Sequence, residues 1–485
     1  MGHRQTLIRI FLTYSTLLTL MPSVSHSDVP YSEGSSSDAG VGGATETNYN
    51  AATSREAVGS DFSNSEKQQK VFNIDSAMEY ALDHNFDLAR SRENINKQHH
   101  VTISARSGFY PSFGLNSLYT RTDSDRLPKL SGQAFGSTTN WNVEAAISYD
   151  LYSGGADSAN SKRAEILMEA AKIDFKTVLQ DVMAQVREKL YDVLLAKLQI
   201  EVQEQATKLL SEELESEKSK LKAGTVSDFN VLRAEVALAN SKTPLIRARN
   251  QLKLAYEELR RVLGVSGDSD DPMYISQFSV EAPLEYVPIE LSLEESLGTA
   301  MKERTDISHR EKQIAAEQEG VNVARAGWFP KVTVNSSYGA EKNRFTDELD
   351  EEVDGWTAGI IGSWNFFDGY RTTSKIAQAN SEVSLARIAL AELRQKVNVE
   401  INRTHSTFLE AKELVSTSAK VSSQAEESLR LARARFNAGA GVQLDVLDSQ
   451  VALTEAKTNH IRALHDYIVA VVRLKRAMGI LDHVN

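Results

Sequence analysis

The sequence predicts an α+β membrane protein that consists of two similar halves. Three observations predict this fold class. Segments of the first half recur more than 200 residues later, each half holds a very long stretch without glycine or proline, and each half holds two segments in which polar and apolar residues alternate. A repeat of this length is a tandem duplication and not the short unit of a solenoid.

The duplication is seen directly in the residues. LKAGTVSDFNVLRAEVALA (221–239) resembles FNAGAGVQLDVLDSQVALT (436–454) without a gap, at a shift of 436 − 221 = 215. ARSGFYPSFGLNSLY (105–119) resembles ARAGWFPKVTVNSSY (324–338), at a shift of 324 − 105 = 219. We therefore divide the chain into a first repeat at 71–265, a crossover linker at 266–292 and a second repeat at 293–480.

Composition restricts the class of protein. The chain has 485 residues, a formal net charge of −12 and no cysteine. The acidic balance argues against nucleic acid as a partner, and the absence of cysteine excludes disulfides and thiolate metal sites. Residues 1–25 carry Arg4 and Arg9 before an apolar run, which is typical of a signal peptide. Residues 26–70 are rich in small and polar residues, so we expect a disordered spacer.

Each half contains a stretch suited to a very long helix. Residues 156–223 and 370–438 hold neither glycine nor proline. At 1.5 Å per residue, each helix would approach about 100 Å. Apolar residues recur at spacings of three and four along both stretches, which predicts that they pack against other helices. After a break that contains glycine, returning helices are expected at about 230–263 and 445–478.

Four segments alternate as strands do. They lie at about 110–121, 141–152, 330–340 and 356–367. Each has about 11 residues, the length of a tilted transmembrane strand. Aromatic residues that could form an interfacial belt lie in these segments: Trp141, Tyr149, Trp356 and Trp364. A soluble antiparallel sheet also alternates, but it rarely carries two such long helices between its hairpins.

Four strands leave two open edges, which lipid does not tolerate. Bacterial outer-membrane barrels have an even number of strands and at least about eight. Three chains would supply 3 × 4 = 12 strands. The sequence therefore predicts a trimeric, 12-stranded outer-membrane β-barrel to which each chain contributes four strands.

This combination resembles the TolC family of outer-membrane channels. The resemblance rests on GFYPSF and GWFPKV, which open the first and third expected strands, and on NAGAGVQLDVLDSQVALTEAK (437–457) at the second helix break. It implies a homotrimer in outer-membrane lipid whose barrel continues as a long α-helical barrel through the periplasm of a Gram-negative bacterium. It also implies a periplasmic adaptor (membrane fusion) protein and an inner-membrane ABC or RND transporter as partners, without catalysis or a cofactor.

The resemblance assigns roles to residues at the helix breaks. Asp445 and Asp448 match the acidic residues of the family's periplasmic constriction, and three chains would gather 3 × 2 = 6 carboxylates around one axis. Such a ring attracts cations, and no other metal site is expected. The expected residues of the turns and of the adaptor contact are Gly224, Asn230, Arg233, Phe436, Gly439 and Gly441. The family pattern has an acidic residue, an aromatic hydroxyl and a basic residue where this chain has Asn230, Phe436 and Gly441.

Other interpretations of these residues remain open. Asp445 and Asn230 also suit the N-cap of a returning helix. Asp445 and Asp448 have no nucleophile or histidine near them in sequence, which argues against an acid/base pair. His99 and His100 would point about 100° apart on a helix, so we expect them not to share a metal.

The expected function is the exit duct of a tripartite export system for proteins or small molecules. The absence of cysteine favours type I secretion, because multidrug-efflux members of the family commonly carry a lipidated cysteine. A multidrug or RND efflux channel is the alternative. A trimeric coiled-coil adhesive or structural surface protein and a soluble helical enzyme are alternatives from other classes.

Overall fold

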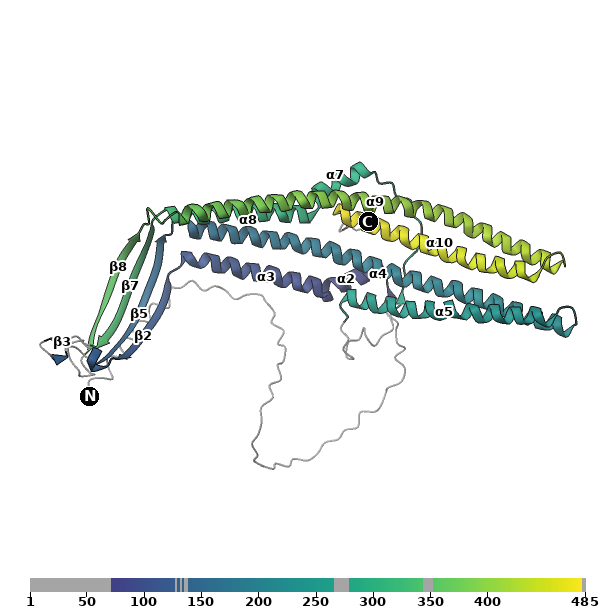
Figure 1. The fold of residues 1–485 in the computed structure, drawn as a ribbon, viewed down its shortest axis with the longest axis horizontal. Helices are drawn as coiled ribbons and strands as arrows, with labels where there is room; N and C mark the ends of the chain where they lie inside the picture. The colour runs from purple at the N-terminus through teal and green to yellow at the C-terminus, as the bar shows by residue number, and fades with distance from the viewer. Residues whose placement is uncertain are drawn as a thin grey trace, which may run out of the picture. The chain divides into compact units, whose positions relative to one another are not determined.

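The computed structural model describes residues 71–126, 129–130, 133–134, 138–265, 279–342 and 352–481. The expected signal peptide and spacer lie outside these residues, as does the first part of the linker. Figure 1 shows the long helices and the four-stranded sheet that make up the described chain.

The two halves have the same order of elements. The first contains α2 (Ile74–His84), α3 (Phe86–Arg106), η2 (Ser107–Phe109), β2 (Ser112–Arg121), β5 (Thr139–Tyr152), α4 (Ala156–Lys222) and α5 (Asp228–Leu263). The second contains α7 (Leu293–Glu303), α8 (Thr305–Arg325), η4 (Ala326–Trp328), β7 (Lys331–Lys342), β8 (Glu352–Ser363), α9 (Arg371–Asn437) and α10 (Gln443–Met478). Short elements complete the chain: β1 (Val71–Phe72), η3 (Ser124–Arg126), β3 (Lys129–Leu130), β4 (Gln133–Ala134) and β6 (Ser279–Val280).

The helices of the two halves obey the shifts found in the sequence. Both α4 and α9 have 67 residues, and both α5 and α10 have 36. The starts of α4 and α9 differ by 371 − 156 = 215, and those of α3 and α8 by 305 − 86 = 219. The absence of glycine and proline therefore correctly predicted two very long helices. No helix within the described ranges has both the length and the hydropathy that a membrane span requires.

The four long strands form one antiparallel sheet in the order β2-β5-β7-β8. This confirms the prediction of long helices with four strands per chain. The expected position of the fourth strand, about 356–367, is wrong, because β8 begins and ends four residues earlier (356 − 352 = 4). Among the described strands, β8 pairs with β7 alone, and its pairing ends where Ser363 lies opposite Lys331, the first residue of β7.

One face of the sheet is apolar and the other is polar. Cross-strand rows on the apolar face are Leu115–Ala145–Tyr338–Trp356 and Tyr149–Val334–Ile360. Rows on the other face are Asn116–Glu144–Gly339–Gly355 and Ser148–Asn335–Gly359. On the edge strands β2 and β8, the apolar side chains are exposed. The chain by itself therefore leaves an apolar sheet face uncovered.

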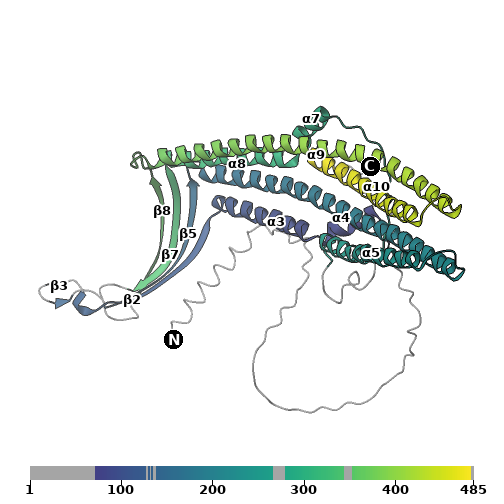
Figure 2. The same ribbon diagram turned by 45° about the vertical axis from the view of Figure 1, so that its right-hand side comes forward.

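Two helix hairpins extend from this sheet. Figures 1 and 2 show α5 beside α4 and α10 beside α9. α10 also packs against α4, and α8 packs against both α4 and α9. One apolar core gathers around α4 and includes Leu190 and Val193, and a second gathers around α9 and includes Val397 and Ile401.

Both returning helices end at a glycine in the left-handed conformation. Gly264 and Gly479 have φ values of 80° and 77°, which glycine adopts without steric cost. A Cβ atom on Gly264 would lie 2.1 Å from the backbone oxygen of His84. Space and backbone conformation therefore both require glycine there.

Candidate functional site

The two helix hairpins reverse direction at equivalent glycines. Gly224 and Gly439 both have a φ of 73°, and a left-handed residue after a helix end is a common way to stop it. Gly441 is not in this conformation, but a Cβ there would come within 3.2 Å of the Arg435 Cβ and the Phe436 nitrogen. Gly439 therefore reverses the chain, and Gly441 allows a close backbone approach.

Asp445 and Asn230 are not the N-caps of the returning helices. α10 begins two residues before Asp445, at Gln443, and its N-cap is Val442. α5 has Ser227 as its N-cap, and neither cap makes a side-chain hydrogen bond. The capping interpretation is therefore wrong. The Asp445 carboxylate lies in the first turn, where the helix dipole favours negative charge.

Asp445 and Asp448 are both exposed, whereas Val446 and Leu447 between them are buried. Their spacing of three residues places the two carboxylates on one face of α10. At the equivalent turn of the first half, the Arg233 guanidinium lies 4.8 Å from the centre of the Phe229 ring. The two tips therefore differ in charge, because the start of α10 carries Asp445 and Asp448 whereas the start of α5 carries Asp228 together with the cation Arg233.

Two contacts join the tips of the first and second hairpins. The Lys220 Nζ lies 4.5 Å from the centre of the Phe436 ring, a cation–π interaction worth about 0.5–1 kcal/mol at an exposed site. The Gln443 Nε2 donates a hydrogen bond to the Asn230 carbonyl oxygen at 3.4 Å. Phe436 therefore contacts the other hairpin through its ring. Sequence reasoning missed Lys220 and Gln443, because their partners are more than 200 residues away.

Two neighbouring carboxylates, one buried and one partly buried, lie on α4 near this tip. Glu217 is fully buried, and its Oε1 accepts a hydrogen bond from the Lys220 Nζ at 2.7 Å. Its Oε2 and the Glu213 Oε1 are buried without a hydrogen-bond partner among the described residues. Burial and the nearby Glu217 raise the pKa of Glu213, while Lys220 and Arg433 act in the opposite direction. Nothing in the sequence distinguished these two glutamates from solvated residues of a long helix.

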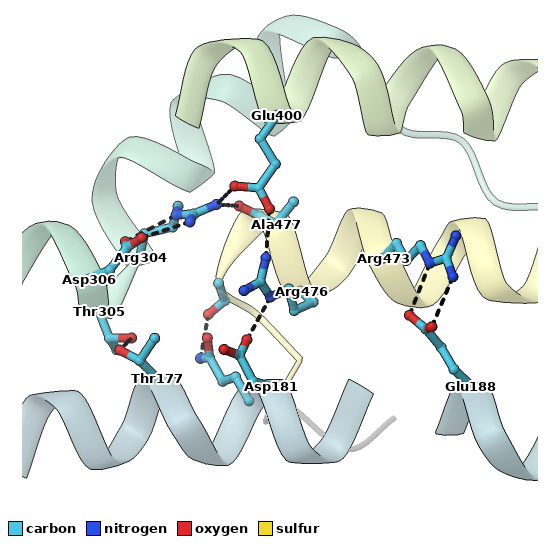
Figure 3. Close-up of polar contacts among 12 residues, drawn as sticks. Thr177, Asp181, Glu188, Arg304, Thr305, Asp306, Glu400, Arg473, Arg476 and Ala477 are labelled. Carbon is cyan, nitrogen blue, oxygen red and sulfur yellow. Dashed lines mark hydrogen bonds and ion pairs between the residues drawn. The ribbon is translucent and has the colours of Figure 1, made fainter. Parts of the chain in front are cut away.

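Ion pairs join α4 to α10 far from the tip (Figure 3). Arg473 of α10 donates two hydrogen bonds to Glu188 of α4, at 3.0 and 2.9 Å. Arg476 lies 2.7 Å from an Asp181 oxygen and 2.6 Å from a Glu400 oxygen, so it connects α10 to both long helices. Each arginine thus ties the last helix of the second half to α4 of the first.

Arg304 extends this network into the junction between α7 and α8. It donates to Glu400 at 2.8 Å, to both oxygens of Asp306 at 3.1 and 2.7 Å, and to the Ala477 carbonyl oxygen at 3.0 Å. Its side chain is only 10% exposed. A buried arginine requires such complete pairing, because an unpaired buried charge is costly.

A protonated histidine provides another link between α10 and α4. The His465 Nε2 lies 2.9 Å from an Asp192 oxygen, and its Nδ1 lies 2.9 Å from an Asp466 oxygen. Burial alone would lower the pKa of His465, but the hydrogen bonds to the two carboxylates outweigh it and raise the pKa to about 9. The imidazole is therefore charged at neutral pH.

The aromatic residues expected in a belt lie in or beside the sheet. Trp141 and Tyr149 lie on β5, and Trp356 lies on β8. Trp364 follows the end of β8, and its Nε1 donates to the Trp328 carbonyl oxygen at 3.1 Å. Trp141 and Tyr149 are 149 − 141 = 8 residues apart, about 26 Å along a strand. At the tilt of about 40° of an outer-membrane barrel strand, this separation is about 20 Å along the barrel axis, which fits within the apolar band of about 25 Å.

The described residues contain no group of three or more His, Cys, Asp or Glu side chains that could hold a metal ion. His99 and His100 are both exposed, and the centres of their rings are 5.6 Å apart. They belong to the surface of α3.

Known proteins share both the sequence pattern and the fold. The family described as "Outer membrane efflux protein" matches residues 77–265 and 297–480, which is more than half of the chain. The pyoverdine export outer membrane protein OpmQ of Pseudomonas putida is 23% identical over 414 residues, which cover 84% of this chain and 85% of OpmQ. The outer membrane protein TolC of Vibrio cholerae is 21% identical over 391 residues, 79% of this chain and 85% of TolC.

A solved structure gives the same result for the fold. The outer membrane channel CmeC of Campylobacter jejuni superposes with a TM-score of 0.72 at 15% identity, covering 90% of this chain and 94% of CmeC. The chain therefore belongs to the outer membrane efflux protein family, the TolC family, whose members are non-enzymatic transport proteins of the Gram-negative outer membrane.

Proposed function

We propose that three copies of this chain form the exit duct of a tripartite export system that spans the cell envelope. Each copy contributes four strands to a 12-stranded barrel and two hairpins to an α-helical barrel in the periplasm. The observation that carries the proposal is the pair of open sheet edges, β2 and β8, with exposed apolar side chains on both. Closing a ring of sheets removes such edges, which lipid does not tolerate.

The duplication specifies how β8 would pair with β2 of the next copy. Within the chain, the repeat equivalents of these strands are β5 and β7, where Ala145 lies opposite Tyr338. Adding 215 to the first number and subtracting 219 from the second gives Ile360 and Tyr119. We infer that Ile360 of one copy lies opposite Tyr119 of the next.

The same shifts reproduce a register that is observed within the chain. Leu115 lies opposite Ala145 in the first hairpin. Adding 219 and 215 gives Val334 and Ile360, which lie opposite each other in the second hairpin. This agreement supports the transfer of register from the β5–β7 contact to the contact between copies.

We also propose that Asp445 and Asp448 line the periplasmic constriction. Both carboxylates are exposed on the first turns of α10, next to the hairpin tip. A closed ring of three copies would bring them around one axis, where like charges repel each other and a cation is attracted. The turn residues Gly224 and Gly439, with Arg233 nearby, would lie at the surface offered to the periplasmic adaptor protein.

For the cargo, we infer protein secretion through an inner-membrane ABC transporter, as in type I systems. The absence of cysteine from all 485 residues supports this branch. Small-molecule efflux with an RND transporter is the second candidate, favoured by the similarity to OpmQ, whose name describes pyoverdine export. A deletion strain separates the two: loss of a protein from the culture medium supports secretion, and increased drug sensitivity with an unchanged set of secreted proteins supports efflux.

The duct itself is tested in planar lipid bilayers. The detergent-solubilised protein is expected to be a trimer and to add discrete conductance steps to the bilayer. A monomeric, water-soluble protein that produces no conductance would contradict the proposal. The adhesive and enzymatic alternatives predict no conductance either.

A further inference from the structure

The contact between α4 and α10 has an equivalent that a single chain does not make. In the duplication, α4 corresponds to α9, and α10 corresponds to α5. The equivalent contact would therefore join α5 to α9. Figures 1 and 2 show these two helices on opposite sides of the molecule, with α4 and α10 between them. A surface of α5 and a surface of α9 are consequently left without their repeat-equivalent partner.

Apolar side chains on α5 show what is missing. Leu447 of α10 is 7% exposed, whereas its equivalent Leu232 of α5 is 57% exposed. Val469 of α10 is likewise buried, and its equivalent Leu254 is exposed. Both returning helices already pack against their own long helix. The extra burial on α10 therefore comes from its additional contact with the other half.

The long helices show the same difference. Ala206 of α4 is 8% exposed, whereas its equivalent Val421 of α9 is 47% exposed. Leu194 of α4 is buried and its equivalent Leu409 of α9 is exposed. These apolar residues of α5 and α9 are exposed, whereas their equivalents on α10 and α4 are buried in a helix contact. Such exposed apolar surfaces indicate a protein interface.

A polar contact is conserved in residue type between the two places. The Gln180 Nε2 of α4 donates to the Gly479 carbonyl oxygen at 3.0 Å, and Gln180 is buried. The equivalents are Gln395 (180 + 215) and Gly264 (479 − 215), the same two residue types. Gln395 is exposed in the single chain. The surface of α9 therefore presents the donor, and the equivalent acceptor residue, Gly264, is the C-cap of α5.

An ion pair is conserved with its charges exchanged. The pair between Arg473 and Glu188 has as its equivalents Glu258 (473 − 215) on α5 and Arg403 (188 + 215) on α9. Both side chains are exposed in the single chain. In the contact within the chain, the returning helix α10 carries the cation. At the open surface, the returning helix α5 carries the anion.

We propose that a second copy of this chain covers these surfaces, with Glu258 of α5 paired to Arg403 of the partner subunit and the Gly264 carbonyl accepting from Gln395 of the partner subunit. This interface rests on the trimer of the proposed function. The exchanged charges fix the order of the hairpins around the ring. A contact between two first halves would place Glu258 beside Glu188, and one between two second halves would place Arg473 beside Arg403. Like charges disfavour both arrangements.

One neighbouring ion pair has no equivalent at the open surface. Arg476 and Asp181 correspond to Arg261 and Lys396, which are both cations. Each has its own carboxylate in the chain: Arg261 lies 3.0 Å from Glu258, and Lys396 lies 2.8 Å from Glu392. Glu258 therefore lies between Arg261 and the incoming Arg403 of the partner subunit, and its carboxylate balances two cations.

The test is a charge exchange in the full-length protein. Glu258→Arg and Arg403→Glu alone are expected to raise the fraction of dissociated chains at least tenfold, as measured by native mass spectrometry in detergent. The double variant is expected to restore the trimer, because it recreates an ion pair of reversed sense. Lys242→Glu is the matched control, because its equivalent Lys457 pairs with Glu426 of its own long helix and not with α4.

The outcomes separate this interface from the proposed function. If the parent protein is a monomer, the trimer itself is wrong. If the parent is a trimer and the single variants assemble equally well, or the double variant fails to recover, the Glu258–Arg403 pair is contradicted while the duct remains. Circular dichroism of each variant verifies that the long helices have folded. Dissociation of the Lys242→Glu control to the same extent would also contradict a pair-specific effect.

Discussion

Arg473 and Glu188 form a two-point ion pair between the last helix of the chain and its first long helix (Figure 3), with nitrogen–oxygen distances of 3.0 and 2.9 Å. A two-point geometry gives directional specificity as well as attraction. The Arg473 side chain is more than half exposed, so solvent screens the pair and limits its contribution to stability. Its position in the duplicated contact matters more than its strength, because it defines which helix faces meet.

Arg304 is buried, in contrast to the exposed Arg473. Replacing Arg304 with alanine removes the arginine that pairs with Asp306 and the donor to the Ala477 carbonyl oxygen, and it leaves Glu400 with Arg476 alone. We therefore expect a loss of about 3–5 kcal/mol of stability. Arg473→Ala serves as the matched exposed case, with an expected loss of at most about 1 kcal/mol. Thermal unfolding followed by circular dichroism measures both. Equal losses for the two variants would contradict the assigned difference in burial.

His465 is expected to make the folded protein less stable as the pH becomes alkaline. Its folded pKa of about 9 lies above the ordinary value of 6.5. The stabilisation is therefore complete below about pH 6.5 and is lost as the pH rises through 9. Between these values, the melting temperature of the parent is expected to fall more steeply than that of His465→Gln, which cannot be protonated. Parallel curves would show that the His465 contacts with Asp192 and Asp466 do not hold a proton.

Glu213 is an acid, unlike His465, and its pKa is also raised in the folded protein. A carboxyl group with a raised pKa contributes stability when protonated, and this contribution is lost as the pH rises through the folded pKa. Glu213→Gln keeps the shape and removes the charge next to Glu217. We expect this variant to be more stable than the parent by about 1 kcal/mol at pH 8 and equal to it in acid. The exposed Glu215→Gln on the same helix is the control, with no expected change.

Asp445 and Asp448 are tested by conductance. The double variant Asp445→Asn, Asp448→Asn removes all six carboxylates of the proposed ring and keeps the side-chain size. It is expected to raise the single-channel conductance or to abolish block by divalent cations, because the repulsive and cation-binding charge is gone. Unchanged conductance together with unchanged block would remove these residues from the constriction. Asp228→Asn, in the first turn of α5, controls for the loss of charge at a hairpin tip.

Sequence periodicity predicted the features that depend on local residue patterns. The two long helices follow from stretches without glycine or proline, and the strands follow from alternation. The end of β8 was misplaced, because a strand ends where its partner ends, and the pairing of Ser363 with Lys331 is not visible in the β8 segment alone. The caps were misplaced for a similar reason, since Ser227 and Val442 precede the acidic and amide residues that suggested a cap.

The contacts between the hairpins could not be predicted from local patterns. Lys220 reaches Phe436, and Glu217 is enclosed although it lies on a charged helix. Both depend on packing between residues that are distant in sequence. The duplication supplies part of this information, because equivalent residues of the two halves indicate which contacts can recur. The exchanged pair of Glu258 and Arg403 became visible only after the structure had shown Arg473 opposite Glu188.

A closed ring of three chains is tested by forming a disulfide between β8 of one chain and β2 of the next. The chain contains no cysteine, so Ile360→Cys with Tyr119→Cys introduces the only thiols. Ile360 and Tyr119 lie on opposite edges of the four-stranded sheet, so a bond between them joins different chains. Cβ atoms of opposed strand residues are about 4.5–5.5 Å apart, close enough for a disulfide after small adjustments. For a closed ring, we expect a covalent three-chain species after mild oxidation and little of it for Ile360→Cys with Leu115→Cys. Failure to form that species in folded, membrane-inserted protein, or equal yield from the Leu115 control, would contradict it.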